Sequence, residues 1–226
     1  MPTHQVQVPC RMSYLSIFKE RNAHIFFKNG LVVTNQTKGG SLMLEALLAY
    51  HCAPSLAGIK PANIAACQKS KFPDLHADID KLNNQLNRKD IYIEILCECE
   101  RRALVIVYRR SVLEKHLQSH NHRAFLSCYG YPEIGSLSDY LNVLRERLDC
   151  DSFPHEIGVF LGYPLHDIYC FINHRDEGCL LIGEWKVYHN VEEAENMFCR
   201  FKSCRKALVR HVTERGKTLA QIFCAA

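Results

Sequence analysis

Hydrophobic and polar positions follow regular periods from about Leu42 to Val212. Apolar residues that recur every three or four positions indicate helices, and alternation with period two indicates strands. The helical spacing predicts helices over 43–51, 72–87, 111–119, 121–129, 136–148 and 191–212. Strand-like runs predict strands around 57–65 and over 91–98, 103–109 and 179–188, with a hairpin turn at 99–102.

These elements predict a single α+β domain over residues 43–212. Its core is a small mixed or antiparallel sheet of about three to four strands, covered by several helices. Pro54, Gly58 and Pro61 are expected to stop the first helix soon after His51. Residues 213–226 are predicted to form a C-terminal tail.

The first 42 residues show no sustained period and are predicted to lie outside the domain. Lys38-Gly39-Gly40 is a tripeptide whose codons can contain a bacterial ribosome-binding sequence, and it stands just before Met43. We therefore expect residues 1–42 to be a translated, non-native leader, with Met43 as the start. The alternative is a genuine N-terminal arm, either disordered or forming two short strands.

The stretch FPHEIGVFLGYP, residues 153–164, predicts a helical corner. Ser152 or Phe153 caps a helix with Pro154 in its first turn, and Gly162 is suited to the left-handed position after its end. Pro164 then starts a second helix, which gives a helix-turn-helix-like corner at 154–173. Residues 154–174 contain no Lys or Arg, which argues against binding of nucleic acid phosphates.

Composition narrows the class of protein. The 226 residues are 47% hydrophobic and 23% charged with a formal net charge of +4, as in an ordinary soluble domain. No apolar run reaches the roughly 18 residues of a membrane span, and the start does not resemble a signal peptide. We therefore expect a cytoplasmic protein without a membrane partner. Its 12 cysteines are expected to be thiols, and without any CxxC pair they do not predict a zinc knuckle or iron–sulfur cluster.

Three motifs together resemble a bacterial family known as domain of unknown function 3793. They are CAPSLAGIKPANI at 52–64, FPHEIGVFLGYP at 153–164 and GEWKVYHNVEEAENMFCRFKSC at 183–204. The likeness covers about residues 43–207. The resemblance implies that the first forty residues are foreign to the family, and it implies no activity, substrate or cofactor. The matching positions are His51–Pro54, Leu56–Lys60, Phe153–Pro164, Trp185–Tyr188, Asn190 and Ala194.

Cys52, His155 and Glu156 are the candidate catalytic residues because they stand in two of these motifs. If the fold brings them together, Cys52 could act as a thiolate with His155 as base and Glu156 as orienting group. Alternatively, Cys52 and His155 could ligate a metal or haem iron. The competing interpretation is that Cys52 is a small buried residue and His155 a structural histidine. His51 is a further possible base or ligand.

Lys60, Tyr163 and Lys186 are the candidate ligand-binding residues. Lys60 could bind an anion or pair with Glu156. Trp185 is expected to lie in the hydrophobic core. His116 and His120 have a spacing that can hold a transition metal, although the segment reads as a solvated surface. These features favour a small-ligand-binding or metal-binding protein, with a non-catalytic interaction or regulatory protein as the alternative. A DNA-binding regulator is the weakest alternative, and whether the protein is an enzyme stays open.

Overall fold

The computed structural model describes residues 40–149 and 153–224. The predicted leader at 1–42 falls mostly outside these residues, as does the predicted cap Ser152. The helices are α2 (Gly40–Leu56), α3 (Leu75–Leu86), α4 (Arg110–Leu117), α5 (His120–Ser127), α6 (Leu137–Leu148), α7 (Ile157–Phe160), α8 (Leu165–His174), α9 (Val191–Val209) and α10 (Leu219–Phe223). The strands are β1 (Ala62–Gln68), β2 (Ile91–Glu98), β3 (Arg102–Arg109), β4 (Leu181–Ile182) and β5 (Lys186–Val187). A 3-10 turn, Asn87–Lys89, follows α3, and a π-helical turn, Arg210–Glu214, continues α9.

The main sheet has the strand order β1-β3-β2 and is antiparallel throughout. β3 pairs with both neighbours, so Ile106 lies opposite Ile64 on one side and Glu94 on the other. The predicted hairpin of β2 and β3 is confirmed, with a register shift between Ile95 and Cys97. The prediction of an α+β domain with a small antiparallel sheet and several covering helices is therefore confirmed.

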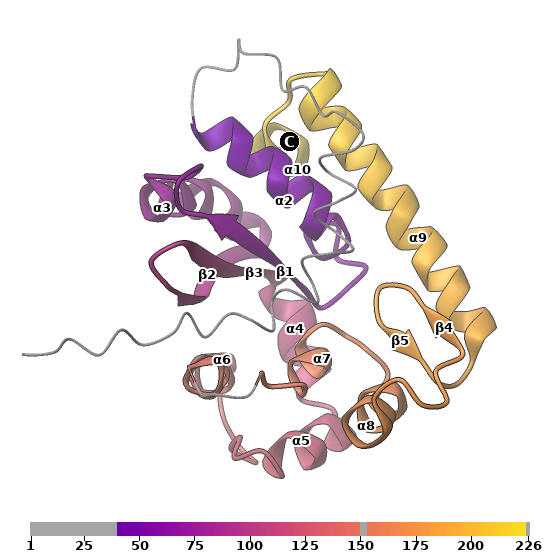
Figure 1. The fold of residues 1–226 in the computed structure, drawn as a ribbon. Helices are drawn as coiled ribbons and strands as arrows, with labels where there is room; N and C mark the ends of the chain where they lie inside the picture. Colours follow the sequence, from indigo (N-terminus) through magenta and orange to yellow (C-terminus); the bar gives the residue numbers. More distant parts are fainter. Residues whose placement is uncertain (1–39, 150–152, 225–226) are drawn as a thin grey trace, which may run out of the picture.

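The two faces of this sheet pack against different sets of helices (Figure 1). α2 and α3 cover one face and α4 to α8 lie on the other, while α9 packs along α2. Side chains of β3 alternate between the two cores, as the strand period requires. Ala103, Val105 and Val107 enter the first core, whereas Leu104, Ile106 and Tyr108 enter the second.

The first helix continues past Pro54, contrary to the prediction that it ends near His51. α2 runs to Leu56 with Pro54 inside its last turns. Pro54 lacks the N–H that would bond to the carbonyl of Tyr50 in a regular helix. Arg205 Nε, from α9, donates to that carbonyl at 2.8 Å. A distant arginine thus satisfies the acceptor that the proline leaves open.

The corner at FPHEIGVFLGYP differs from the predicted one at its start. Pro154 does not begin a helix, because 154–159 form tighter turns in which residue i+3 donates to residue i. The helix itself, α7, is a single turn. Its end is as predicted: Gly162 has φ +68°, Tyr163 N donates to Gly158 O at 2.9 Å and Gly162 N to Val159 O at 3.0 Å. These two bonds form a Schellman motif, and α8 follows from Leu165.

The predicted strand at 179–188 is two short strands joined by a turn. Gly183 N donates to Trp185 O at 3.0 Å, which reverses the chain between β4 and β5. The ring of Phe198 occupies the space where a Cβ of Gly183 would lie. The hairpin packs on α9 through a third core of Trp185, Val187, Ala194 and Phe201, so the prediction that Trp185 is buried is confirmed.

Residues 213–224 belong to the segment predicted to be a C-terminal tail, and they include α10. Thr218 and Gln221 form a capping box that starts α10, and the Leu219 side chain is fully buried. The backbone N–H of Leu219 donates to Oε2 of Glu45 in α2 at 2.5 Å. α10 therefore closes the first core beside α2 and α3.

Candidate functional site

Lys60 lies in the turn between α2 and β1, and its side chain is only 3% exposed. Its Nζ lies 5.0 Å from the ring centroid of Tyr163 and 5.5 Å from that of Phe201. Within the described part of the chain it donates no hydrogen bond. A buried ammonium normally has a carboxylate or several acceptors, so this amine is unusual.

Tight packing of two motifs places Lys60 there. A Cβ on Gly162 would lie 2.6 Å from Cδ of Pro61, so only glycine allows the corner after α7 to approach this turn. On the other side, Arg109 donates to the carbonyl of Leu56 through Nε at 3.0 Å and Nη2 at 2.7 Å. Because the turn is held from both sides, the Lys60 side chain is directed inward toward Tyr163.

Lys60 and five side chains near it or near its neighbours are together called the Lys60 centre. Glu184, in the turn between β4 and β5, forms an ion pair with Arg205 of α9 at 2.8 Å. Both side chains interact electrostatically with Lys60. Glu184 attracts the charged amine, and Arg205 repels it. An ionised Cys52 would act on Lys60 in the same direction as Glu184. The members of the centre are His51, Cys52, Lys60, Tyr163, Glu184 and Arg205.

Burial shifts the pKa values of four of these groups. Desolvation lowers the pKa of Lys60 to about 8, and together with the neighbouring Arg205 it lowers the pKa of His51 to about 4. Desolvation also raises the pKa values of Cys52 and Tyr163 well above their usual range. At neutral pH His51, Cys52 and Tyr163 are therefore neutral, and the charges of the centre belong to Lys60, Arg205 and Glu184. Several strongly perturbed groups in one cluster are typical of functional sites.

The structure does not bring Cys52 to His155 and Glu156. Cys52 lies in the first core, on the α2 side of the sheet, whereas Ile157 next to Glu156 lies in the second core on the opposite side. The raised pKa of Cys52 is also the opposite of what a thiolate nucleophile needs. Cys52 instead lies near Lys60 and Cys67.

His155 belongs to a separate surface cluster with Lys186. The Nε2 atom of His155 is 2.8 Å from Nη1 of Arg175, so it accepts a hydrogen bond and is neutral. Partial burial and the positive charge of Arg175 lower the pKa of His155. The His155 ring packs on Phe171 at 5.1 Å, and Lys186 Nζ lies 5.0 Å from the same ring while pairing with Asp176.

Glu156 forms an ion pair with Arg147. Its carboxylate is 1% exposed and pairs with Arg147 of α6. Desolvation and this carboxylate together raise the pKa of the nearby Tyr131 hydroxyl. Glu156 therefore ties the helical corner to α6, and it is not paired with Lys60 as the sequence had allowed.

Residues 40–149 and 153–224 contain no group of three or more His, Cys, Asp or Glu side chains that could hold a metal ion. The centroids of the His116 and His122 rings are 4.1 Å apart, but one nitrogen of each ring forms a hydrogen bond with a backbone carbonyl. His116 Nε2 bonds to Val159 O and His122 Nδ1 to His116 O. These histidines join α4, α5 and α7.

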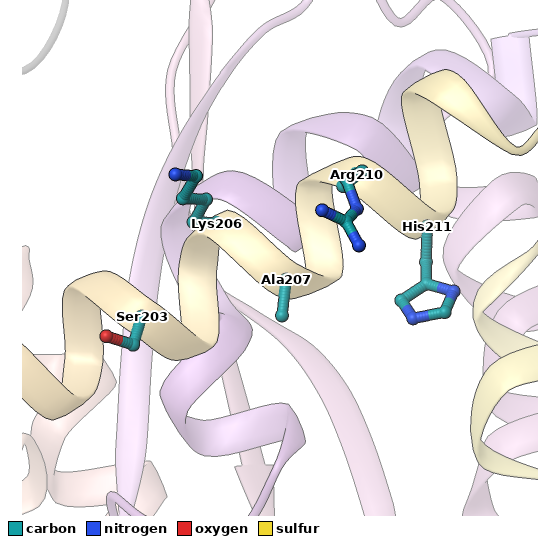
Figure 2. A pocket seen from close by; sticks show the side chains of 5 residues that line it. All are labelled: Ser203, Lys206, Ala207, Arg210 and His211. Carbon is teal, nitrogen blue, oxygen red and sulfur yellow. The ribbon is translucent and has the colours of Figure 1, made fainter.

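A shallow hollow of about 230 Å³ lies along the C-terminal half of α9 (Figure 2). All its lining side chains come from α9 and the π-helical turn that continues it. None of them belongs to the Lys60 centre. The lining residues are Ser203, Lys206, Ala207, Arg210 and His211.

A family model described as protein of unknown function (DUF3793) matches residues 48–223. The chain belongs to the DUF3793 family. The match includes all six members of the Lys60 centre and also α10. Comparison with curated proteins and with solved structures gave no match.

In this DUF3793 chain, three motifs that are far apart in sequence meet at Lys60. His51, Cys52 and Lys60 come from the first motif, Tyr163 from the second and Glu184 from the third. Sequence reasoning named Lys60 and Tyr163 but missed Glu184, Arg205 and the ring of Phe201. Glu184 stands directly before the Trp185–Tyr188 motif, which was a usable signal. No local pattern marks Arg205, because its partners lie in α2 and the hairpin.

No helix in the described residues combines the length and apolar character needed to cross a bilayer.

Proposed function

We propose that this DUF3793 protein binds a small acidic ligand at the Lys60 centre. The observation that carries the proposal is that Lys60, a residue only 3% exposed, has aromatic rings beside its amine and donates no hydrogen bond to any residue that the structure describes. Burying a charged group without a hydrogen-bonding partner costs free energy, and a structural lysine would be expected to have one. A carboxylate or phosphate oxygen of a ligand would supply the missing acceptor.

The charge balance of the centre supports an anion. Lys60 and Arg205 are two cations, Glu184 is the carboxylate that acts on both, and His51 is neutral because its pKa is lowered to about 4. One positive charge is therefore left without a counter-charge inside the centre. An anionic ligand would neutralise it in a low-dielectric environment, where such a charge pair is strongest.

The surroundings of Lys60 support a ligand with an apolar body. Tyr163 and Phe201 flank the amine, and the Tyr163 ring packs against Trp185 with centroids 5.1 Å apart. Small-molecule sites typically combine such apolar walls with a few polar groups. The side chains of Glu184 and Arg205 are 24% and 22% exposed, so this ion pair of the centre contacts solvent. Entry of a ligand would pass this ion pair beside the short β4–β5 hairpin.

The test compares the Lys60→Met variant with the wild-type protein. We expect small carboxylates or phosphate esters to raise the thermal unfolding temperature of the full wild-type chain. Lys60→Met removes a buried charge but keeps most of the side-chain volume, so its unliganded stability should stay equal or rise. The variant should lose the response to acids. Native mass spectrometry of the purified wild-type chain would show whether such a ligand copurifies.

Lys69→Met is the matched control. Lys69 is half-exposed and pairs with Glu98 at 3.0 Å, so its loss should change stability by less than about 1 kcal/mol and leave the ligand response intact. If no acid stabilises the wild type and Lys60→Met unfolds more easily, Lys60 is structural and the proposal is wrong.

The cytoplasm is the proposed location, supported by a high content of cysteines, which stay reduced there.

A further inference from the structure

We propose that Lys60 forms a reversible imine with the carbonyl carbon of its ligand, which would then be a small oxo acid. This inference rests on the proposed function, because it assigns the chemistry of the same site. The structural basis is a buried primary amine that is not engaged in hydrogen bonds with described residues and that has a carboxylate and a second cation close by.

A nucleophilic lysine needs a fraction of its amine in the neutral form. Desolvation and a neighbouring cation are the two environments that produce such lysines, and Lys60 has both. The rings of Tyr163 and Phe201 replace water around the amine, and Arg205 repels a proton on it. By contrast, Lys69 and Lys186 form ion pairs with the carboxylates of Glu98 and Asp176, so their amines already have partners.

The reaction balances without an oxidant or reductant. The lone pair of the neutral amine attacks the carbonyl carbon, which forms a C–N bond and gives a carbinolamine. The carbinolamine oxygen then leaves as water, with its second proton passing from nitrogen to oxygen, and a C=N bond remains. Hydrolysis reverses the step. We assign the relay of these protons to Glu184, the carboxylate that acts electrostatically on Lys60.

The acid group of the ligand follows from the charge of the product. The imine nitrogen then takes up a proton from solvent, which restores a positive charge at the position of the Lys60 amine. A carboxylate on the ligand, next to the reacting carbonyl, would compensate that charge together with Arg205. An aldehyde or ketone without an acid group would leave the positive charge of the protonated imine without this compensation. It should therefore form less imine.

The experiment traps the imine in the full chain. The protein is incubated with pyruvate or glyoxylate and reduced with sodium borohydride, and the intact mass and the modified peptide are measured. We expect a single adduct on Lys60 with the mass of the oxo acid minus water plus two hydrogens. Acetone, which has a carbonyl but no acid, should give a much smaller adduct.

Two variants keep the result interpretable. Lys60→Met should give no adduct while retaining the circular dichroism spectrum and the Trp185 fluorescence of the folded protein. Lys69→Met should be modified as the wild type is. Equal modification of many lysines, or an adduct that persists in Lys60→Met, would overturn the imine.

The imine and the acidic-ligand proposal can fail separately. If acids without a carbonyl group raise the unfolding temperature of the wild type but no oxo acid is trapped, the imine is wrong and acid binding stands. If oxo acids are trapped on Lys60 but acids without a carbonyl have no effect, the imine stands and charge alone does not select the ligand. If neither is observed, both are overturned.

Discussion

The guanidinium of Arg205 occupies the position that a helix N–H would take on the carbonyl of Tyr50. The distance from Arg205 Nε to Tyr50 O is 2.8 Å, and the residue whose N–H is missing is Pro54. The same side chain pairs with Glu184 through Nη2 at 2.8 Å. Arg205 therefore joins α9, the proline-containing turn of α2 and the β4–β5 hairpin beside Lys60.

This arrangement predicts that the cost of losing Arg205 depends on Pro54. Arg205→Met should destabilise the wild type by about 1–3 kcal/mol, because the partly buried carbonyl of Tyr50 and the carboxylate of Glu184 both lose a donor. In a Pro54→Ala background the alanine N–H can bond to Tyr50 O, so the loss should be smaller. Urea unfolding of the four proteins gives the coupling energy directly. Additive effects would contradict the assignment of Arg205 as the substitute donor.

Gly162→Ala should destabilise the protein much more than Gly178→Ala. Both glycines have positive φ, +68° and +73°, so both substitutions cost about 1–2 kcal/mol of backbone strain. Only at Gly162 would the new Cβ lie 2.6 Å from Pro61, whereas nothing lies within 4 Å at Gly178. We expect about 2–4 kcal/mol for Gly162→Ala, measured by chemical denaturation. Equal losses at the two positions would show that the contact with Pro61 contributes nothing.

Acid should destabilise the fold as pH falls from about 6.5 to about 4. Burial lowers the pKa values of His51 and His116 to about 4, whereas in the unfolded chain they titrate near 6.5. Between these values the unfolded state binds more protons, so the free energy of unfolding decreases as pH falls. We expect roughly 1–3 kcal/mol per histidine. The His51→Gln and His116→Gln double variant should show a shallower pH dependence in this window, and an unchanged slope would refute the assignment.

Trp185→Phe should leave a buried carboxylate with one donor fewer. Trp185 Nε1 donates to Asp167 Oδ2 at 2.7 Å, and Tyr188 N donates to Asp167 Oδ1 at 2.9 Å. Loss of the first bond should cost about 1–3 kcal/mol in thermal unfolding followed by circular dichroism. Tyr188→Phe is the control, because the hydroxyl that it removes bonds to Arg175 O at an exposed position. If both variants lose the same stability, Asp167 does not depend on the indole.

Glu156→Gln should weaken the fold without affecting ligand binding at Lys60. The substitution removes the charge that pairs with Arg147, whose own side chain is 34% exposed, so solvent reduces the loss to about 1–3 kcal/mol. Glu98→Gln breaks a pair with Lys69 whose side chains are 36% and 40% exposed, and it should cost less than about 1 kcal/mol. A Glu156→Gln variant that folds normally but loses the response to acids would place Glu156 in the functional site instead.

Much of the local structure could be predicted because local chemistry decides it. The helical stripe of Leu75, Ile79, Leu82 and Leu86 gave α3, and all four side chains are buried. Ser136, at the start of the helix predicted over 136–148, forms a capping box with Asp139. Gly162 adopts the left-handed conformation expected of a glycine after a helix. In each case the residues concerned are within about one or two turns of each other.

The candidate site was only partly predictable. Cys52, His155 and Glu156 were grouped because they stand in motifs, but motif membership does not say which face of a sheet a side chain reaches. The sheet lies between Cys52 and the FPHEIG turn, and Glu156 is neutralised by Arg147. Lys60 and Tyr163 were named separately, and only the contact of Pro61 with Gly162 brings them together.

The sequence by itself thus determined most of the secondary elements, the α+β class and the membership of the motifs, since these depend on periodicity and on turn residues. The tertiary structure alone decided that α2 continues past Pro54, through a hydrogen bond between residues 155 positions apart. It alone decided that Lys60 is buried beside Tyr163, Glu184 and Arg205. Burial and long-range electrostatics arise only when distant segments pack together, and they are what set the protonation of the amine.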